Sequence, residues 1–314
     1  MATVVQYERF GGPEVLEVVE VPTPDAPPGA VVVAVKAAGV NPIDAKLRSG
    51  ARASSEITEP RRVGSDAAGV VVDVGDRVSD WSIGDEVVVR NADGAYASHV
   101  VAREDQLVRK PASVSWEVAA AIGVPVSTAY QALRSLGVTD GTTLLLHGGS
   151  GSVGRAAIQF AHRWGATVIA TAAENNHERL RELGAIPVAY GGGLADRIRA
   201  AAPGGIDRVL DAVGTGEALE TSFELVADRD HIGTLVVGAR AAELGIHAWS
   251  GGNPVPLTAE ERRLRAEAYD VVLDLLERGE FQIDIARSFP LAEVAEAHRL
   301  VEGGHPGGKV LLIP

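Results

Sequence analysis

The feature that most constrains the fold is a glycine-rich turn between a short apolar strand and a helix. The letters LLLHGGSGSVGRAAIQFA (144–161) predict a strand over 143–147 and a helix over 152–164. The intervening pattern is G-x-G-x-x-G. In a βαβ unit its first glycine permits the tight turn, the second admits a pyrophosphate, and the third allows close helix packing. The candidates for binding a dinucleotide at this helix N-terminus are Gly149, Ser150, Gly151, Ser152, Val153 and Gly154.

The segments that follow the motif give it the required context. Helical apolar spacing begins at Ser115, a good N-cap residue, and continues to 137. Beyond the glycine turn, predicted strands (166–172, 186–190, 206–213, 231–239) alternate with predicted helices (176–184, 194–201, 216–226). This alternation is typical of an α/β fold with a doubly wound parallel sheet, in which the glycine turn follows the first strand.

The two ends of the chain have a different pattern. Residues 1–110 contain short alternating runs rich in valine, which predict a compact, barrel-like β domain. From about 265 the sequence predicts a helix (266–279), a mixed segment (285–304) and a final apolar strand. A chain of 314 residues is long enough for two domains, each with its own core.

Composition excludes several classes of function. The formal net charge of −13 argues against a nucleic-acid partner, because no basic stripe is present to neutralise phosphates. The absence of cysteine excludes disulfides, thiolate zinc sites and a cysteine nucleophile. The charged, alternating N-terminus does not have the pattern of a signal peptide, and no uncharged apolar run of about 18 residues appears. We therefore expect a cytoplasmic protein with no membrane segment.

Several motifs together carry a resemblance to a known family. They are AAGVNPIDAKLRSG, VGSDAAGVVVDVG, GAYASHVV, AAAIGVPVSTAYQAL, the glycine-turn segment, FPLAEVAEAHRLVEGG and GGKVLLIP. In this order and spacing the chain resembles the zinc-free quinone oxidoreductase branch of the medium-chain dehydrogenase/reductase superfamily. The resemblance implies a GroES-like catalytic domain from residues 1–115 and 265–314, a Rossmann domain from 116–264, bound NADPH, and usually a homodimer.

The same motifs bear on zinc. Where zinc-dependent relatives carry a cysteine, this chain has Asn41, and their histidine segment here reads Gly64-Ser65-Asp66. Neither asparagine nor serine is a competent zinc ligand, and a catalytic zinc needs three protein ligands. The eight histidines are scattered along the chain. We expect no metal site.

The choice of coenzyme depends on the residues after the second Rossmann strand. NAD-specific sites place an acidic residue about 20 residues beyond the glycines, whereas this chain has the small, uncharged sequence TAA. Without that carboxylate, a 2′-phosphate is not repelled. The residues expected near it are Thr171, Ala172, Asn176, Arg179 and, from the resemblance, Tyr190. We expect NADPH; the neighbouring Glu174 leaves NADH as an alternative, and Asn176 as a helix cap with a solvated Arg179 is the structural alternative.

The segment NPIDAKLR has a structural and a functional interpretation. Structurally, Pro42 fixes a turn and Asp44 pairs with Arg48 at i,i+4. The resemblance instead implies that Asn41 contacts the nicotinamide end and that Asp44 orders the loop. It also matches Lys46 to a lysine that binds the nicotinamide ribose and helps relay a proton in enone-reducing plant members. A solvated surface lysine is the alternative for Lys46.

The resemblance implies further cofactor contacts. They are Thr128, Asp211, Ala212, Val213, Gly238, Ala239 and Lys309. Thr128 matches a threonine that binds the carboxamide, unless its hydroxyl bonds its own helix backbone. Residues 237–239 are expected to end the fifth strand near the nicotinamide, since ligands lie at the carboxyl ends of parallel strands. Trp249 either lines the substrate cleft or anchors a dimer contact.

The function implied is hydride transfer from NADPH to a quinone or to the C=C bond of an α,β-unsaturated carbonyl, without zinc. Such a reaction needs orientation of the hydride and a donor for the developing enolate oxygen. A pathway-specific enoyl reductase or reductive cyclase is the alternative within enzymes. A non-catalytic NADPH-binding protein is the alternative outside them.

Overall fold

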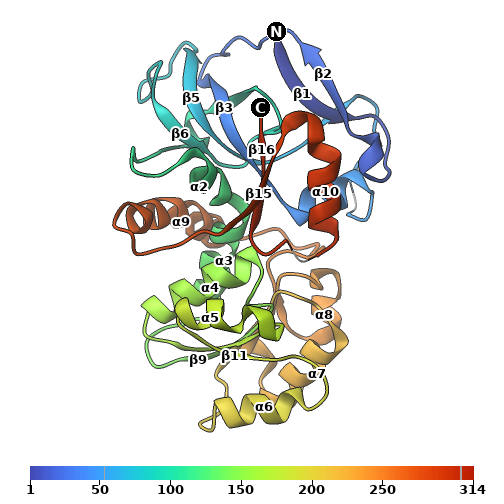
Figure 1. Ribbon diagram of the computed structural model, residues 1–314, viewed down its shortest axis with the longest axis vertical. Coiled ribbons are helices and arrows are strands. Elements are labelled where there is room, and N and C mark those ends of the chain that lie inside the picture. The colour runs from blue at the N-terminus through green and yellow to red at the C-terminus, as the bar shows by residue number, and fades with distance from the viewer. Residues whose placement is uncertain (53, 305) are drawn as a thin grey trace. The chain divides into compact units, whose positions relative to one another are not determined.

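The computed structural model describes residues 1–52, 54–304 and 306–314. The chain forms two compact units, which Figure 1 shows along the colour gradient: Met1–Val124 with Tyr269–Pro314, and Pro125–Ala268. Helices α3 (Gly123–Ser135) and α9 (Ala259–Glu277) each begin in one unit and end in the other. The divisions between the two units, at 124/125 and 268/269, therefore lie within helices.

The first unit is built mostly from β-strands. Its strands are β1 (Ala2–Tyr7), β2 (Glu17–Val21), β3 (Ala30–Val40), β4 (Arg61–Arg62), β5 (Asp66–Val74), β6 (Glu86–Val89), β7 (His99–Arg103), β8 (Leu107–Arg109), β15 (Ile285–Pro290) and β16 (Lys309–Ile313). Its helices are α1 (Pro42–Arg48), α2 (Trp116–Ala121) and α10 (Val294–Glu302). Ser115 caps α2 as predicted, because its Oγ accepts a hydrogen bond from the amide of Val118 at 3.3 Å.

The sheets of this unit join the two ends of the chain. The larger sheet has the order β15-β16-β3-β5-β6-β8, with β7 also pairing with β3, and a smaller sheet has the order β2-β1-β4. All pairs are antiparallel except β15 with β16. Strand β3 (AVVVAVKAAGV) is buried along nearly all its length, and it pairs with β5, β7 and β16. Figure 1 shows the C-terminal β16 beside the N-terminal β3.

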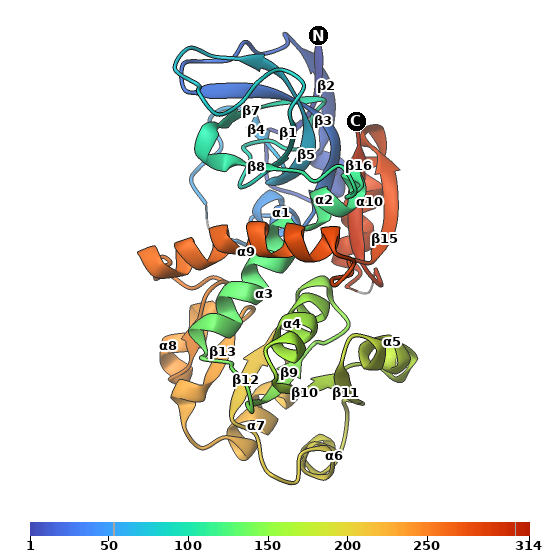
Figure 2. The same cartoon turned by 90° about the vertical axis from the view of Figure 1, so that its left-hand side faces the viewer.

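The second unit is the predicted doubly wound parallel sheet. Its strands are β9 (Thr143–His147), β10 (Thr167–Thr171), β11 (Ala185–Val188), β12 (Arg208–Asp211), β13 (Ile232–Thr234) and β14 (His247–Ala248). Its helices are α4 (Ser152–Arg163), α5 (His177–Glu182), α6 (Leu194–Ala201), α7 (Gly216–Leu225) and α8 (Ala241–Leu244), with parts of α3 and α9. The sheet order is β11-β10-β9-β12-β13-β14, and α4 and α7 lie on opposite sides of it (Figure 2). The predicted architecture is therefore observed: a β-rich unit accompanies a unit with a doubly wound parallel sheet.

One predicted element of this unit is wrong. The strand expected over 231–239 ends at Thr234, and residues Gly238–Arg240 form a 3-10 turn. The turn lies against residues that follow β14, because a Cβ on Gly238 would be 1.9 Å from the carbonyl oxygen of Ser250. Apolar letters alone could not distinguish this packed turn from a continuing strand.

Trp249, for which the sequence suggested a substrate cleft or a dimer contact, packs inside the second unit. Its ring lies against Gly233, where a Cβ would be 2.4 Å from the indole, and its Nε1 donates to Glu261 at 2.7 Å. Only 7% of Trp249 is exposed, so it belongs to the core of the second unit.

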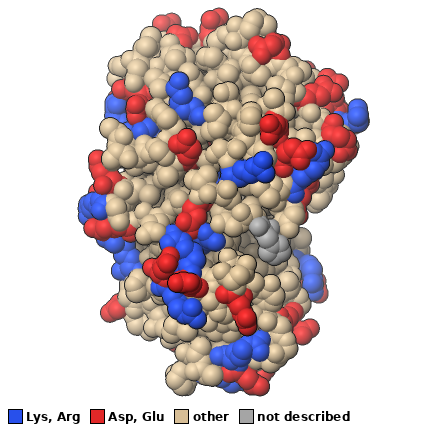
Figure 3. Space-filling view, in the orientation of Figure 1, with Lys and Arg blue, Asp and Glu red and all other residues tan. Residues whose placement is uncertain are grey.

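The surface agrees with the composition. On the face in Figure 3, the basic and acidic side chains of the described residues are interspersed and do not form a basic stripe. Within the described residues, no helix combines the length and the apolar character needed to span a bilayer.

Candidate active site

The glycine turn connects β9 to α4 and is shaped by close contacts. Gly148, just before the motif, has a left-handed backbone (φ +86°), so it, and not Gly149, makes the sharp turn. A Cβ on Gly149 would be 2.8 Å from that of Ala170 in β10. A Cβ on Gly154 would be 2.2 Å from the carbonyl oxygen of Gly148. The first and third glycines of the motif thus permit tight packing of α4 and the turn onto the sheet.

Gly151 differs from the other two glycines of the motif. The nearest atom to a Cβ placed on it is 3.8 Å away, an ordinary contact, so nothing in the protein requires a glycine there. Gly151 is the N-cap of α4, and it provides no side-chain cap for the amides of the first turn. Open space at an uncapped helix N-terminus fits the phosphates of a dinucleotide.

The carboxyl ends of β9, β10 and β12 bring three polar residues into register. His147 pairs with Thr171 on one side and with Asp211 on the other. The Thr171 hydroxyl accepts from the amide of Gly148 at 3.2 Å and lies 3.3 Å from His147 Nδ1. Burial lowers the pKa of His147 to about 4, so its ring is neutral at pH 7. The buried side chain of Thr171 therefore holds the backbone of the glycine turn at Gly148.

The remaining residues predicted around a 2′-phosphate lie beyond β10 and β11. Ala172 is buried, and its amide donates to the carbonyl of Val188. Asn176 ends a 3-10 turn just before α5, and Arg179 on α5 pairs with Glu182 at 2.9 Å. Tyr190, expected at a strand end, lies two residues past the end of β11 and is exposed.

Asp211 closes the turn after β12 and is fully buried. Its Oδ1 accepts from the amides of Val213 and Gly214, and its Oδ2 accepts from the Thr234 hydroxyl at 2.8 Å. Ala212 and the exposed Val213 follow it. Asp211 thus shapes the loop backbone at the carboxyl edge. Ala239, in the 3-10 turn after β13, donates its amide to Gly251.

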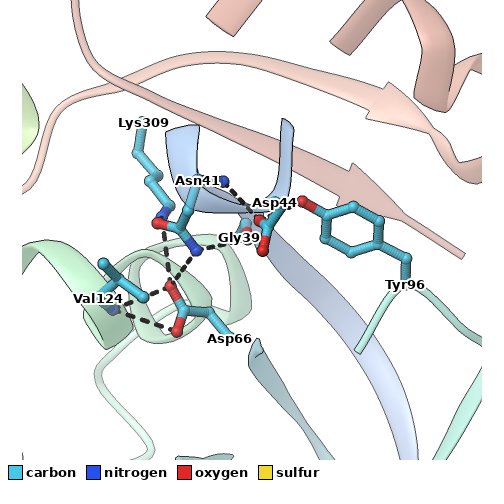
Figure 4. Close-up of polar contacts among 7 residues, drawn as sticks. All are labelled: Gly39, Asn41, Asp44, Asp66, Tyr96, Val124 and Lys309. Carbon is cyan, nitrogen blue, oxygen red and sulfur yellow. Dashed lines mark hydrogen bonds and ion pairs between the residues drawn. The ribbon is translucent and has the colours of Figure 1, made fainter. Parts of the chain in front are cut away.

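In the first unit, Asn41 and Lys309 meet in a buried polar network, shown in Figure 4. Asn41 follows β3, and Lys309 begins β16. The Lys309 ammonium donates to Asn41 Oδ1 and, at 3.3 Å, to Asp66 Oδ2. Asn41 Nδ2 donates to the same Asp66 oxygen at 2.8 Å and to the carbonyl of Gly39 at 3.3 Å. The amide of Asn41 is therefore fixed in one orientation.

Asp44 belongs to the same network but contacts neither Lys309 nor Arg48 directly. Its Oδ2 accepts from the amide of Asn41 at 2.9 Å and from the Tyr96 hydroxyl at 2.7 Å. Burial is the main cause that raises the pKa of Asp44 to about 6. Arg48 instead pairs with Glu302 of α10 at 2.5 Å, which corrects the expected i,i+4 pair.

Two predicted residues have polar groups without partners in the described part of the chain. Lys46 lies on the exposed side of α1, and no hydrogen bond or ion pair of its ammonium is found there. The Thr128 hydroxyl on α3 likewise makes no hydrogen bond with the described residues, so the expected alternative, a bond to its own helix, is not observed.

The described residues offer few clustered donors for a metal ion. Among residues 1–52, 54–304 and 306–314, no three histidine or acidic side chains gather as ligands could. At Asn41, the oxygen that would face a cation already faces the ammonium of Lys309. The residues present at this position do not fit a zinc ion.

Sequence reasoning missed Asp66, Tyr96, His147 and Gly148 as members of these networks. A signal was present for Asp66: a charged residue at the start of the apolar run DAAGVVV needs a buried partner. The lysine that begins KVLLI has the matching pattern. Nothing in the sequence indicated that these two segments lie side by side.

Comparison with known proteins places the chain among oxidoreductases. Residues 27–112 match the alcohol dehydrogenase GroES-like domain, and residues 183–312 match a family described as zinc-binding dehydrogenase. The quinone oxidoreductase of Pseudomonas aeruginosa is 32% identical, with all of both chains covered. The human quinone oxidoreductase is 30% identical, with 98% of this chain and 97% of that protein covered. The structure of Escherichia coli quinone oxidoreductase complexed with NADPH superposes with a TM-score of 0.84 at 27% identity, covering 99% of this chain and 100% of that chain.

Proposed function

The chain belongs to the quinone oxidoreductase branch of the medium-chain dehydrogenase/reductase superfamily, and from this membership we propose that it is an NADPH-dependent oxidoreductase that reduces quinones or α,β-unsaturated carbonyls. The observation that carries the proposal is the glycine turn: packing accounts for Gly149 and Gly154, whereas Gly151 faces open space at a helix N-terminus. A bound dinucleotide supplies the hydride.

Three groups of residues are proposed to hold the dinucleotide. Amides of the glycine turn bind its phosphates, and Arg179 binds the 2′-phosphate, since no acidic residue follows β10 directly. Asn41 and Lys309 face the nicotinamide end. The structures of relatives complexed with NADPH support this choice of coenzyme.

The reduction needs positive charge or a hydrogen-bond donor where the substrate oxygen gains charge. We assign this role to the exposed Lys46, whose ammonium is available for an approaching carbonyl oxygen. The reaction is proposed to proceed without zinc, because Asn41 and Ser65 stand where zinc ligands would be needed and Lys309 already provides a cation beside Asn41.

Gly151→Ala tests the cofactor site. The added methyl group fits the protein, so the melting temperature should change little, whereas NADPH affinity should fall at least tenfold because the methyl group occupies space needed by a phosphate. Gly154→Ala is the matched control: its Cβ would be 2.2 Å from a carbonyl oxygen, so it should lower the melting temperature. Unchanged NADPH affinity in Gly151→Ala would contradict the proposed site.

The substrate is tested by a screen of NADPH oxidation with quinones, short enals, cyclic enones and enoyl thioesters. Turnover confined to enoyl thioesters would identify a dedicated enoyl reductase, and NADPH binding without turnover would identify a binding protein. Metal analysis should find less than one zinc per chain. The resemblance also predicts a homodimer, which light scattering of the purified protein tests.

A further inference from the structure

Asp66 is the residue that connects the parts of the buried network in the first unit. It is 2% exposed and begins β5. Besides Asn41 and Lys309, its two oxygens accept from the amide of Val124 in the first turn of α3, at 3.1 and 3.0 Å (Figure 4). One carboxylate thus holds the loop after β3, the start of β16 and the start of α3.

Two glycines, Gly123 and Gly39, lie so close to the Asp66 carboxylate and the Lys309 side chain that neither position has room for a Cβ. A Cβ on Gly123 would be 1.9 Å from Asp66 Oδ1. A Cβ on Gly39 would be 2.8 Å from Lys309 Cε and 2.5 Å from the carbonyl oxygen of Ala120. Both charged groups are therefore held against bare backbone, which restricts where each can lie.

The charge of Lys309 depends on its acidic neighbours. Burial lowers the pKa of Lys309, whereas Asp66 from β5 and Asp44 from α1 raise it. Helix α2, which packs against β16, has only alanines among its buried residues. Helix α10 contributes His298, which is held by Arg48, and Arg287 of β15 lies over the ring of Phe289. Asp66 is the acidic group in direct contact with the ammonium.

We propose that Asp66 is a positioning residue for the nicotinamide end of the site: its carboxylate keeps the Lys309 ammonium charged and the Asn41 amide in one orientation. This inference rests on the proposed function, in which Lys309 and Asn41 face the dinucleotide. Loss of the Asp66 charge leaves a buried ammonium that sheds its proton as the pH rises.

Asp66→Asn tests the inference with two measurements. In the protein without cofactor, the NMR chemical shift of Lys309 Cε should report a titration midpoint at least one pH unit below that of the native protein. The dissociation constant for NADPH, followed by its fluorescence, should rise between pH 6.5 and 9. This rise should be about tenfold larger in Asp66→Asn than in the native protein, because a charge-assisted hydrogen bond is lost. A purely structural role would produce no such dependence on pH.

Two further variants separate the charge effect from damage to the fold. Asp73→Asn removes a carboxylate of the same strand that accepts from the backbone amides of Ala26 and Val74, so its pH dependence should follow that of the native protein. In the double variant with Asp66→Asn, Lys309→Met should abolish the weakening of NADPH binding at high pH, because no ammonium remains to lose its proton. The effects of the two substitutions on NADPH affinity should therefore be non-additive. Additive losses would assign Asp66 to the fold alone.

If Asp66→Asn does not fold, Gly123→Ala tests the inference instead. The methyl group of the alanine displaces the Asp66 carboxylate but leaves it an acid. This variant should lower the Lys309 midpoint in the same direction. An unchanged midpoint in a variant that folds, with native NADPH binding intact, overturns this inference. Failure of the native protein to bind NADPH at any pH instead overturns the proposed function.

Discussion

Replacing Asp44 with asparagine should stabilise the protein increasingly as the pH rises. Asp44 is buried, and its pKa is raised from 3.8 to about 6. A raised pKa means that the folded state favours the protonated carboxyl group. The contribution of Asp44 to stability is therefore fully present below pH 3.8 and is lost as the pH rises through about 6.

The magnitude follows from the two pKa values. A shift of roughly two units corresponds to about 3 kcal/mol, of which roughly 2 to 3 kcal/mol develops between pH 4 and pH 7. Both hydrogen bonds, from the Asn41 amide and the Tyr96 hydroxyl, are accepted by the same oxygen, Oδ2. The carbonyl oxygen of an asparagine side chain can accept both, so Asp44→Asn removes the charge while these contacts remain.

The assay is urea unfolding of both proteins at a series of pH values. The free energy of unfolding of Asp44→Asn minus that of the native protein should increase by roughly 2 to 3 kcal/mol between pH 4 and pH 7. The difference is the informative quantity, because any constant penalty for the new amide group cancels from its slope. A flat difference would refute the assignment of a destabilising buried charge to Asp44.

Three further outcomes are expected. Arg179→Ala should weaken NADPH binding by about 1–3 kcal/mol and leave NADH nearly unchanged, as measured by fluorescence titration; equal losses would contradict its role at a 2′-phosphate. Lys46→Ala should lower kcat on an enone by about 10²–10³ while NADPH affinity falls modestly, and Lys46→Arg should recover little. Burial lowers the pKa of His298 to about 3, so its stabilising contribution is present above pH 6.5 and is lost on acidification. Between pH 7 and pH 4, the free energy of unfolding of His298→Gln should therefore fall by roughly 3 kcal/mol less than that of the native protein.

The fold could be predicted from the sequence wherever a local pattern decides the structure. The glycine turn, the alternation after it and the cap at Ser115 each depend on residues close together in the chain, and the structure has them. The strand expected over 231–239 was wrong because contacts with Ser250 decide the path of that segment. Local hydrophobicity contains no information about such a contact.

The candidate site was predictable to a smaller extent. The motifs identified Asn41, Asp44 and Lys309 as separate residues, but the network that joins them depends on pairings between β16 and β3 and between β3 and β5. Asp66 entered the sequence analysis only as the neighbour of Ser65, which stands where zinc-dependent relatives have a histidine. Its contacts arise because the chain ends fold into one sheet, which a pattern of neighbouring letters cannot specify.

The position of Lys46 illustrates how distant contacts can fix an exposed residue. The helix that carries it, α1, is short, and an isolated helix of this length is not stable in water. Tyr96 holds its first turn through Asp44, and Glu302 of α10 holds its last turn through Arg48. The backbone of Lys46 is thus anchored on both sides while its ammonium stays exposed. A flexible lysine on an anchored backbone can follow charge that develops on a substrate oxygen, whereas the buried Lys309 cannot move without breaking its contacts with Asn41 and Asp66. Under the proposed function, Lys309 is therefore the lysine for fixed recognition, and Lys46 is the lysine for the substrate oxygen that gains charge.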